Sequence, residues 1–134
     1  MSEIAENIGS IEQELRAIAV EHGYAHRPAQ LIAVSKKQPD EKIQAALHAG
    51  HRVFGENRVQ EAQEHWGLRR ADYPDLELHL IGPLQTNKVK DALALFDVIQ
   101  TLDREKLARI LGKEMSTSGK KIPCYVQVNT GEEA

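Results

Sequence analysis

The sequence has little of several features that mark other classes of protein. Its single cysteine, Cys124, excludes an internal disulfide framework and fits a reducing cytoplasm. No apolar run is long enough to span a bilayer. The amino terminus is acidic and amphipathic rather than basic and then apolar, which argues against a signal peptide. The sequence therefore predicts a cytoplasmic protein without a membrane segment.

Positive charge and phosphate-binding motifs are also scarce. The formal net charge is -3, which argues against nucleic acid or an anionic membrane as the main partner. Neither a Gly-x-Gly-x-x-Gly run nor a Walker loop is present, so a nucleotide-binding fold is not indicated.

His22 and His26 have the spacing of a helical zinc pair, but Gly23 makes a helix doubtful there, and no zinc site is expected.

What the sequence does contain is an alternation of strand-like and helix-like segments. A first helix is expected over residues 3–22, where Ile4, Ile8, Ile11, Leu15 and Ile18 form one apolar stripe. Five strands are expected over residues 31–36, 52–55, 76–81, 97–101 and 122–128. Helices joined to these strands by short links predict parallel βαβ units. The fold class is therefore α/β, as a (β/α) barrel or a doubly wound sheet, in a single domain over residues 1–134.

Several helix boundaries carry capping signals. Gly50 is placed for a left-handed cap after a helix that Pro39 opens. Asn57, with Gln60 three residues later, resembles a capping box, and Asp103 is expected to cap the last helix. The helices between are expected to bury Ile43, Ala46, Leu47, Val59, Ala62 and Trp66.

The most informative strand runs from Leu31 to Lys36. Its apolar run is typical of a strand covered on both faces, and it stops at Lys36 and Lys37. A lysine at the rim of a core can be partly desolvated, which favours the neutral amine that forms a Schiff base with an aldehyde. The alternative interpretation is that both lysines are solvated residues that follow a strand.

Polar residues follow each of the predicted strands. In a parallel sheet the carboxyl ends of the strands lie at one edge, and ligands bind there. An amine, carboxylates, amides and a glycine turn would meet at this edge and would suit a carbonyl-bearing ligand held by the amine. The residues concerned are Lys36, Glu56, Asn57, Gly82, Asp103 and Asn129.

Each of these residues also has a structural explanation. Asn57 can be a helix cap only, and Glu56 can pair with a surface arginine such as Arg52 or Arg58. Gly82 can be a simple turn residue.

Two further residues are expected inside the fold. His79 shares a strand face with Glu77 and Ile81, which would place it inside a barrel, although a buried histidine is more often satisfied by a neighbour. Cys124 is expected to be an inert core thiol.

Five segments carry a resemblance to a known family. Ala33–Lys36, Phe54–Glu61, His79–Lys88, Asp97–Asp103 and Val126–Asn129 are similar, in the same order, to segments of the pyridoxal phosphate homeostasis proteins. The resemblance implies a barrel like the amino-terminal domain of alanine racemase, with pyridoxal 5′-phosphate (PLP) at the carboxyl-end face.

The resemblance also implies roles for single residues. Lys36 matches the lysine that forms the aldimine with PLP, and Asn57 matches a residue beside the cofactor. His79 and Gly82 match the motif that lines the same mouth. The implied function is to hold PLP, deliver it to PLP-requiring apoenzymes and maintain its intracellular level, without catalytic turnover.

A complete (β/α)₈ barrel takes about 250 residues, so the sequence is expected to form the amino-terminal portion of one. Its open sheet edges make self-association one possible outcome. Two alternatives remain. One is a PLP-dependent amino-acid racemase-like enzyme, with Tyr125 or His79 as the second acid or base. The other is a truncated fragment that no longer binds PLP.

Overall fold

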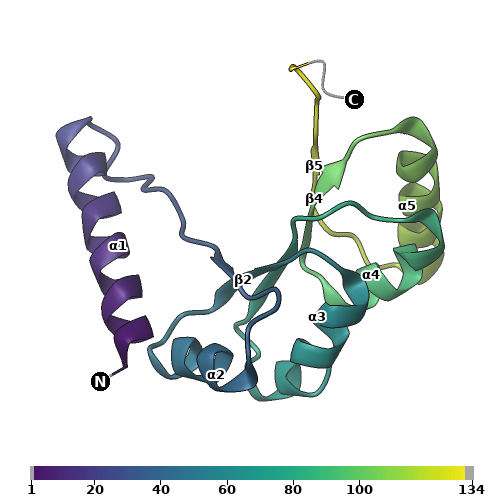
Figure 1. The fold of residues 1–134 in the computed structure, drawn as a ribbon. Coiled ribbons are helices and arrows are strands. Elements are labelled where there is room, and N and C mark those ends of the chain that lie inside the picture. Colours follow the sequence, from purple (N-terminus) through teal and green to yellow (C-terminus); the bar gives the residue numbers. More distant parts are fainter. Residues whose placement is uncertain (1, 132–134) are drawn as a thin grey trace.

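The structure, a computed structural model, describes residues 2–131. Helices and strands alternate along the chain as the sequence predicts (Figure 1). The elements are α1 (Glu3–Glu21), β1 (Ala33–Val34), α2 (Asp40–His48), β2 (Val53–Glu56), α3 (Val59–Trp66), β3 (Glu77–Leu80), α4 (Val89–Leu95), β4 (Val98–Leu102), α5 (Glu105–Ser118) and β5 (Cys124–Val126). Two short 3₁₀ helices, Arg69–Asp72 and Thr86–Lys88, lie in the connections.

The strands form one parallel sheet in the order β1-β2-β3-β4-β5. A doubly wound sheet reverses its strand order at a switch point, whereas a barrel keeps the order of the chain. The observed order is therefore that of a barrel. Figure 1 shows α2 to α5 along one side of the sheet, with α1 beyond the β1 end of the row.

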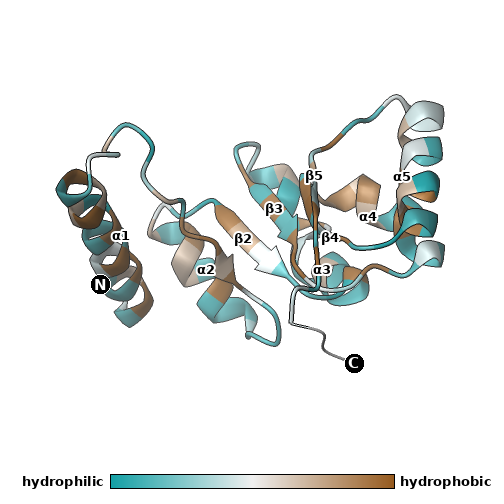
Figure 2. Ribbon diagram, turned by 90° about the horizontal axis from the view of Figure 1, so that it is seen from above, coloured by the Kyte–Doolittle hydropathy of each residue, from teal (hydrophilic) through white to brown (hydrophobic). Residues whose placement is uncertain are grey.

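The core lies between the sheet and the helices. The predicted buried faces of α2 and α3 are confirmed, and the side chains of Trp66 and Phe54 pack against each other, with ring centroids 4.7 Å apart. Figure 2 shows apolar residues on the strands, whereas α1 and α5 alternate between apolar and hydrophilic positions. The core therefore lies on the sheet face that the helices cover. Its residues include Ile43, Ala46, Leu47, Phe54, Val59, Ala62, Trp66, Leu78, Leu80, Ile99 and Leu107.

The prediction of a long first strand covered on both faces is wrong. Strand β1 spans only Ala33–Val34, and the side chain at Val34 is 45 % exposed. The reason is position: β1 is an edge strand that pairs with β2 alone, and the helices cover only one of its faces. An apolar run predicts burial only where a second layer is present to cover it.

Two of the predicted helix caps are also wrong. The N-caps of α3 and α5 are Arg58 and Arg104, not Asn57 and Asp103, and neither makes a side-chain capping hydrogen bond. The preceding strands continue one residue further than predicted, so each helix begins one residue later. The prediction for Gly50 is confirmed, because its φ is +92° after the end of α2.

Helix α1 buries only part of its apolar stripe. Ile4 and Ile8 pack against the core, whereas Ile11 and Ile18 are exposed. The helix ends at Glu21, so His22 and His26 do not share a helical face. None of the helices within residues 2–131 has both the length and the apolar character that a bilayer crossing needs.

Candidate functional site

The two lysines lie in a tight turn that follows β1. The backbone N–H of Gln38 donates to the carbonyl of Ser35 at 3.2 Å, and Lys37 has a φ of +58°. A positive φ at the third residue is the mark of a type II turn. The N–H of Lys37 donates to Oε2 of Glu61 at 3.0 Å, which ties the turn to α3. Lys36 is exposed, so the expected partial desolvation of its amine is not found.

Lys36 and Asn57 are brought together in one pocket of about 280 Å³. An adjoining pocket of about 640 Å³ shares Asn57 with it and extends to Lys88. The first pocket lies after the carboxyl ends of β1 and β2 and the second after those of β2 and β3, at the edge where a parallel sheet binds ligands. The first is lined by Lys36, Lys37, Asn57, Arg58, Gln60, Glu61 and Glu64, and the second by Asn57, Arg58, Val59, Gln60, Pro83, Leu84, Gln85 and Lys88.

Gly82 is more than a turn residue. A Cβ atom at this position would lie 2.1 Å from the carbonyl oxygen of Asn57, closer than any side chain tolerates. On its other side, the hydroxyl of Thr101 donates to the carbonyl of Gly82 at 2.8 Å. Gly82 is therefore held between the ends of β2 and β4, and its lack of a side chain lets the segment approach Asn57.

His79 lies deeper, in β3, with 3 % of its surface exposed. Its Nδ1 is 2.9 Å from Nε2 of Gln100, and its Nε2 is 3.4 Å from Oε1 of Glu77. An amide nitrogen only donates, so the network assigns Nδ1 as the acceptor and places the proton of the neutral ring on Nε2. Gln100 satisfies Nδ1, as the structural explanation predicts in part, whereas the buried Nε2 has no hydrogen-bond partner among the described residues. His79 does not line the pocket that contains Lys36.

The sequence places Glu56 at this edge of the sheet but does not predict that its carboxylate is buried. Glu56 is 0 % exposed, and its Oε2 accepts hydrogen bonds from Ser35 Oγ at 2.5 Å, His65 Nδ1 at 2.8 Å and Trp66 Nε1 at 3.0 Å. The alternative explanation, in which Glu56 pairs with a surface arginine, is therefore wrong. Arg52 pairs with Asp75 instead.

The strand alternation contains a signal for this cluster. Phe54 and Glu56 are two residues apart in β2, so they face the same layer of helices. A carboxylate on the covered face needs buried donors. The sequence did not reveal which donors these are, because Ser35 lies in the turn after β1 and Trp66 lies at the end of α3.

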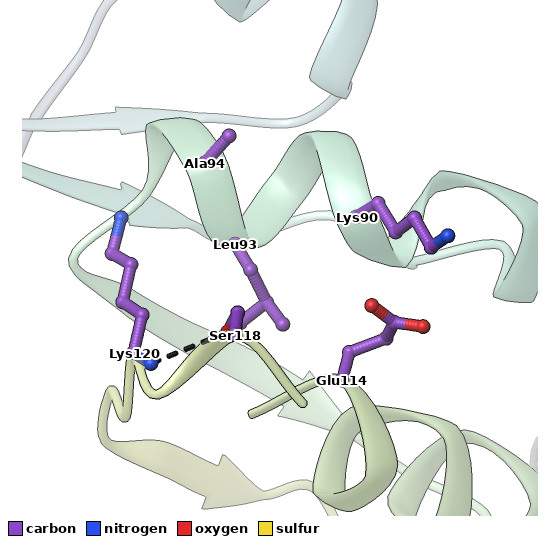
Figure 3. A pocket seen from close by; sticks show the side chains of 6 residues that line it. All are labelled: Lys90, Leu93, Ala94, Glu114, Ser118 and Lys120. Atoms are coloured by element: carbon purple, nitrogen blue, oxygen red, sulfur yellow. Dashed lines mark hydrogen bonds between the residues drawn. The ribbon is translucent and has the colours of Figure 1, made fainter. Parts of the chain in front are cut away.

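A separate pocket of about 310 Å³ lies between α4 and the end of α5 (Figure 3). Leu93 and Ala94 line it from α4, and Lys90 and Glu114 stand at one side of it. The N–H of Lys120 donates to Ser118 Oγ at 3.2 Å. This pocket contains none of the residues at the carboxyl ends of β1 to β3, so it lies outside the candidate site.

The family described as alanine racemase, N-terminal domain, matches residues 7–133. The chain belongs to this family. The pyridoxal phosphate homeostasis protein of Vibrio cholerae is 39 % identical over 136 residues, which cover 100 % of this chain and 58 % of that protein. The chain thus spans less than two thirds of the length of this relative.

Comparison with solved structures supports the same assignment. PipY of Synechococcus elongatus, solved with PLP bound, has a TM-score of 0.84 at 38 % identity, over 98 % of this chain and 57 % of PipY. PipY solved without PLP gives 0.82 at 37 % identity, over 98 % of this chain and 58 % of PipY. Membership of the alanine racemase N-terminal domain family confirms the predicted α/β fold, a parallel barrel-like sheet that is incomplete over these residues.

Proposed function

We propose that this chain binds PLP through Lys36 and contributes to maintaining intracellular PLP, without turnover of its own. The observation that carries the proposal is the shared pocket of Lys36 and Asn57 at the carboxyl ends of the strands. The relatives support it, because one is named a pyridoxal phosphate homeostasis protein and PipY was solved with PLP bound.

The residues present fit the two ends of the cofactor. PLP supplies an aldehyde carbon with which a primary amine condenses reversibly, and the Lys36 amine is reachable from solvent. Arg58 and Lys88 line the adjoining pocket and bring positive charge that suits a phosphate.

In this proposal each residue has its own part. Lys36 holds the aldehyde carbon, and the Asn57 amide orients the ligand by hydrogen bonding. Gly82 has no side chain and so lets the end of β3 lie against the backbone of Asn57. His79, held by Gln100, supports the sheet from which these segments project.

Binding is favoured over racemisation because neither Tyr125 nor His79, the two residues considered as a second acid or base, lines the pocket that contains Lys36. Tyr125 is 55 % exposed on β5, at the other edge of the sheet from β1. His79 is buried between Gln100 and Glu77. An assay of alanine enantiomers distinguishes the two functions, since turnover would favour the racemase.

The direct test is borohydride reduction after addition of PLP, followed by peptide mass mapping. We expect the parent chain to carry the label on Lys36. The peptide that contains residue 36 should carry no label in Lys36→Ala, and Lys37→Ala should keep the label on Lys36. A new absorbance band should accompany attachment and disappear in Lys36→Ala. Label on Lys37, or an unchanged band in Lys36→Ala, contradicts the proposal.

Two partner classes complete the proposal. PLP-requiring apoenzymes would receive the cofactor, and transfer from the loaded chain to an apoenzyme tests this by recovery of the apoenzyme's activity. A second copy of the chain would pair along the open edges of β1 or β5, and sedimentation over a range of concentrations tests that association.

A further inference from the structure

The lysine turn, residues 35–38, is held at two of its residues by carboxylates of the neighbouring segment 56–61. At its first residue, Ser35 donates its hydroxyl to Glu56, the last residue of β2. At its third residue, Lys37 donates its N–H to Glu61 in α3. Asn57 lies in the same segment, directly after Glu56. The turn is therefore anchored to the segment that contains Asn57.

We propose that Ser35 and Glu56 are a positioning pair that holds the Lys36 amine beside Asn57. Glu56 acts through Ser35 and does not touch the ligand. This inference rests on the proposed function, because Lys36 is the residue that it positions.

The bonds of Ser35 leave this residue little freedom. Its N–H donates to the carbonyl of Gly55 at 3.0 Å, its carbonyl accepts from Gln38 at 3.2 Å, and its hydroxyl donates to Glu56 at 2.5 Å. Ser35 is 3 % exposed and directly precedes Lys36. Because all three polar groups of Ser35 are engaged, the direction in which the chain leaves it toward Lys36 is set.

The Glu56 carboxylate also offers an internal control. Trp66 donates to the same oxygen at 3.0 Å, but Trp66 belongs to α3 and not to the lysine turn. Its hydrogen bond contributes to packing between β2 and α3. Removal of the Ser35 bond should therefore disturb Lys36, whereas removal of the Trp66 bond should not.

The test compares Ser35→Ala with Trp66→Phe in the full chain. PLP is added, the adduct is reduced with borohydride, and label is quantified at Lys36 and Lys37. We expect the Lys36-to-Lys37 ratio to fall about fivefold in Ser35→Ala, the factor that corresponds to one hydrogen bond. Trp66→Phe should keep the parent ratio. Ser35→Thr should restore it, because it keeps the hydroxyl.

The outcomes separate this inference from the proposed function. If the parent labels Lys36 and Ser35→Ala keeps the parent ratio, the inference is overturned and the proposed function stands. If the parent takes no label at Lys36, the proposed function fails, and amide hydrogen exchange at Lys37 and Gln38 decides the positioning. Amide exchange about fivefold faster in Ser35→Ala than in Trp66→Phe supports the positioning role of Ser35. Equal exchange rates in the two variants overturn that role.

Discussion

Gly82 lies against the backbone of Asn57, so closely that a Cβ on residue 82 would be 2.1 Å from the Asn57 carbonyl oxygen and 2.8 Å from its carbonyl carbon. The atoms that a side chain would strike are backbone atoms, which cannot move aside as a flexible side chain can. The contact joins the carboxyl ends of β2 and β3, from which two of the predicted site residues come.

Gly82→Ala should destabilise the fold. The β2 and β3 ends must separate to admit the methyl group, and overpacking of this kind costs about 1–3 kcal/mol. Gly112→Ala is the control, because Gly112 lies in α5 with nothing within 4 Å of the added Cβ. That change should raise the free energy of unfolding by about 1 kcal/mol through helix propensity. Urea denaturation measures both, and equal stabilities for the two variants would contradict the close contact.

Glu56→Ala should be strongly destabilising. It leaves the buried donors of Ser35 and Trp66 and the partly buried donor of His65 without their acceptor, and each unsatisfied buried donor costs about 1–3 kcal/mol. We expect a loss of roughly 3–5 kcal/mol in the free energy of unfolding, since water entering the cavity would satisfy part of the set. A variant within about 1 kcal/mol of the parent would show that the network contributes little.

Lys37→Gly should stabilise the chain, which is unusual for a change to glycine. Lys37 has a φ of +58°, and a left-handed backbone disfavours residues with a Cβ by about 1–2 kcal/mol. Glycine removes that strain and keeps the N–H that donates to Glu61. The matched control is Lys42→Gly within α2, which should lose about 1 kcal/mol. Thermal melts of the two variants should shift in opposite directions.

Cys124 should make stability depend on alkaline pH. Burial raises the pKa of the Cys124 thiol above its ordinary value of 9.0. When a thiol has a higher pKa in the folded state, the free energy of unfolding is unchanged at pH values below the pKa of the unfolded state. That free energy then falls as the pH rises through the pKa of the folded state. The free energy of unfolding should therefore fall above pH 9.0 and fall less in Cys124→Ala. Iodoacetamide should also react more slowly with the folded chain than with the urea-denatured chain.

The sequence alone predicted the order of elements and the covered helix faces. Periodicity was enough for Ile43, Ala46 and Leu47, because a helix repeats its direction every 3.6 residues wherever it is placed. The turn at Gly50 could also be predicted from the local sequence, because it depends on the φ of one residue. The predicted strand ends included Lys36 and Asn57, the resemblance to a family implied their roles, and the structure places both in one pocket.

The tertiary structure decided what depends on neighbours distant in the chain. The sequence did not show that β1 is an edge strand, that Glu56 accepts hydrogen bonds from the turn after β1 and from α3, or that Gly82 touches Asn57. Propensity and periodicity act within a few residues, whereas these contacts arise from the register of parallel strands and the layer of helices packed on them. The sequence therefore determined which residues face the core, and the fold determined which of them meet.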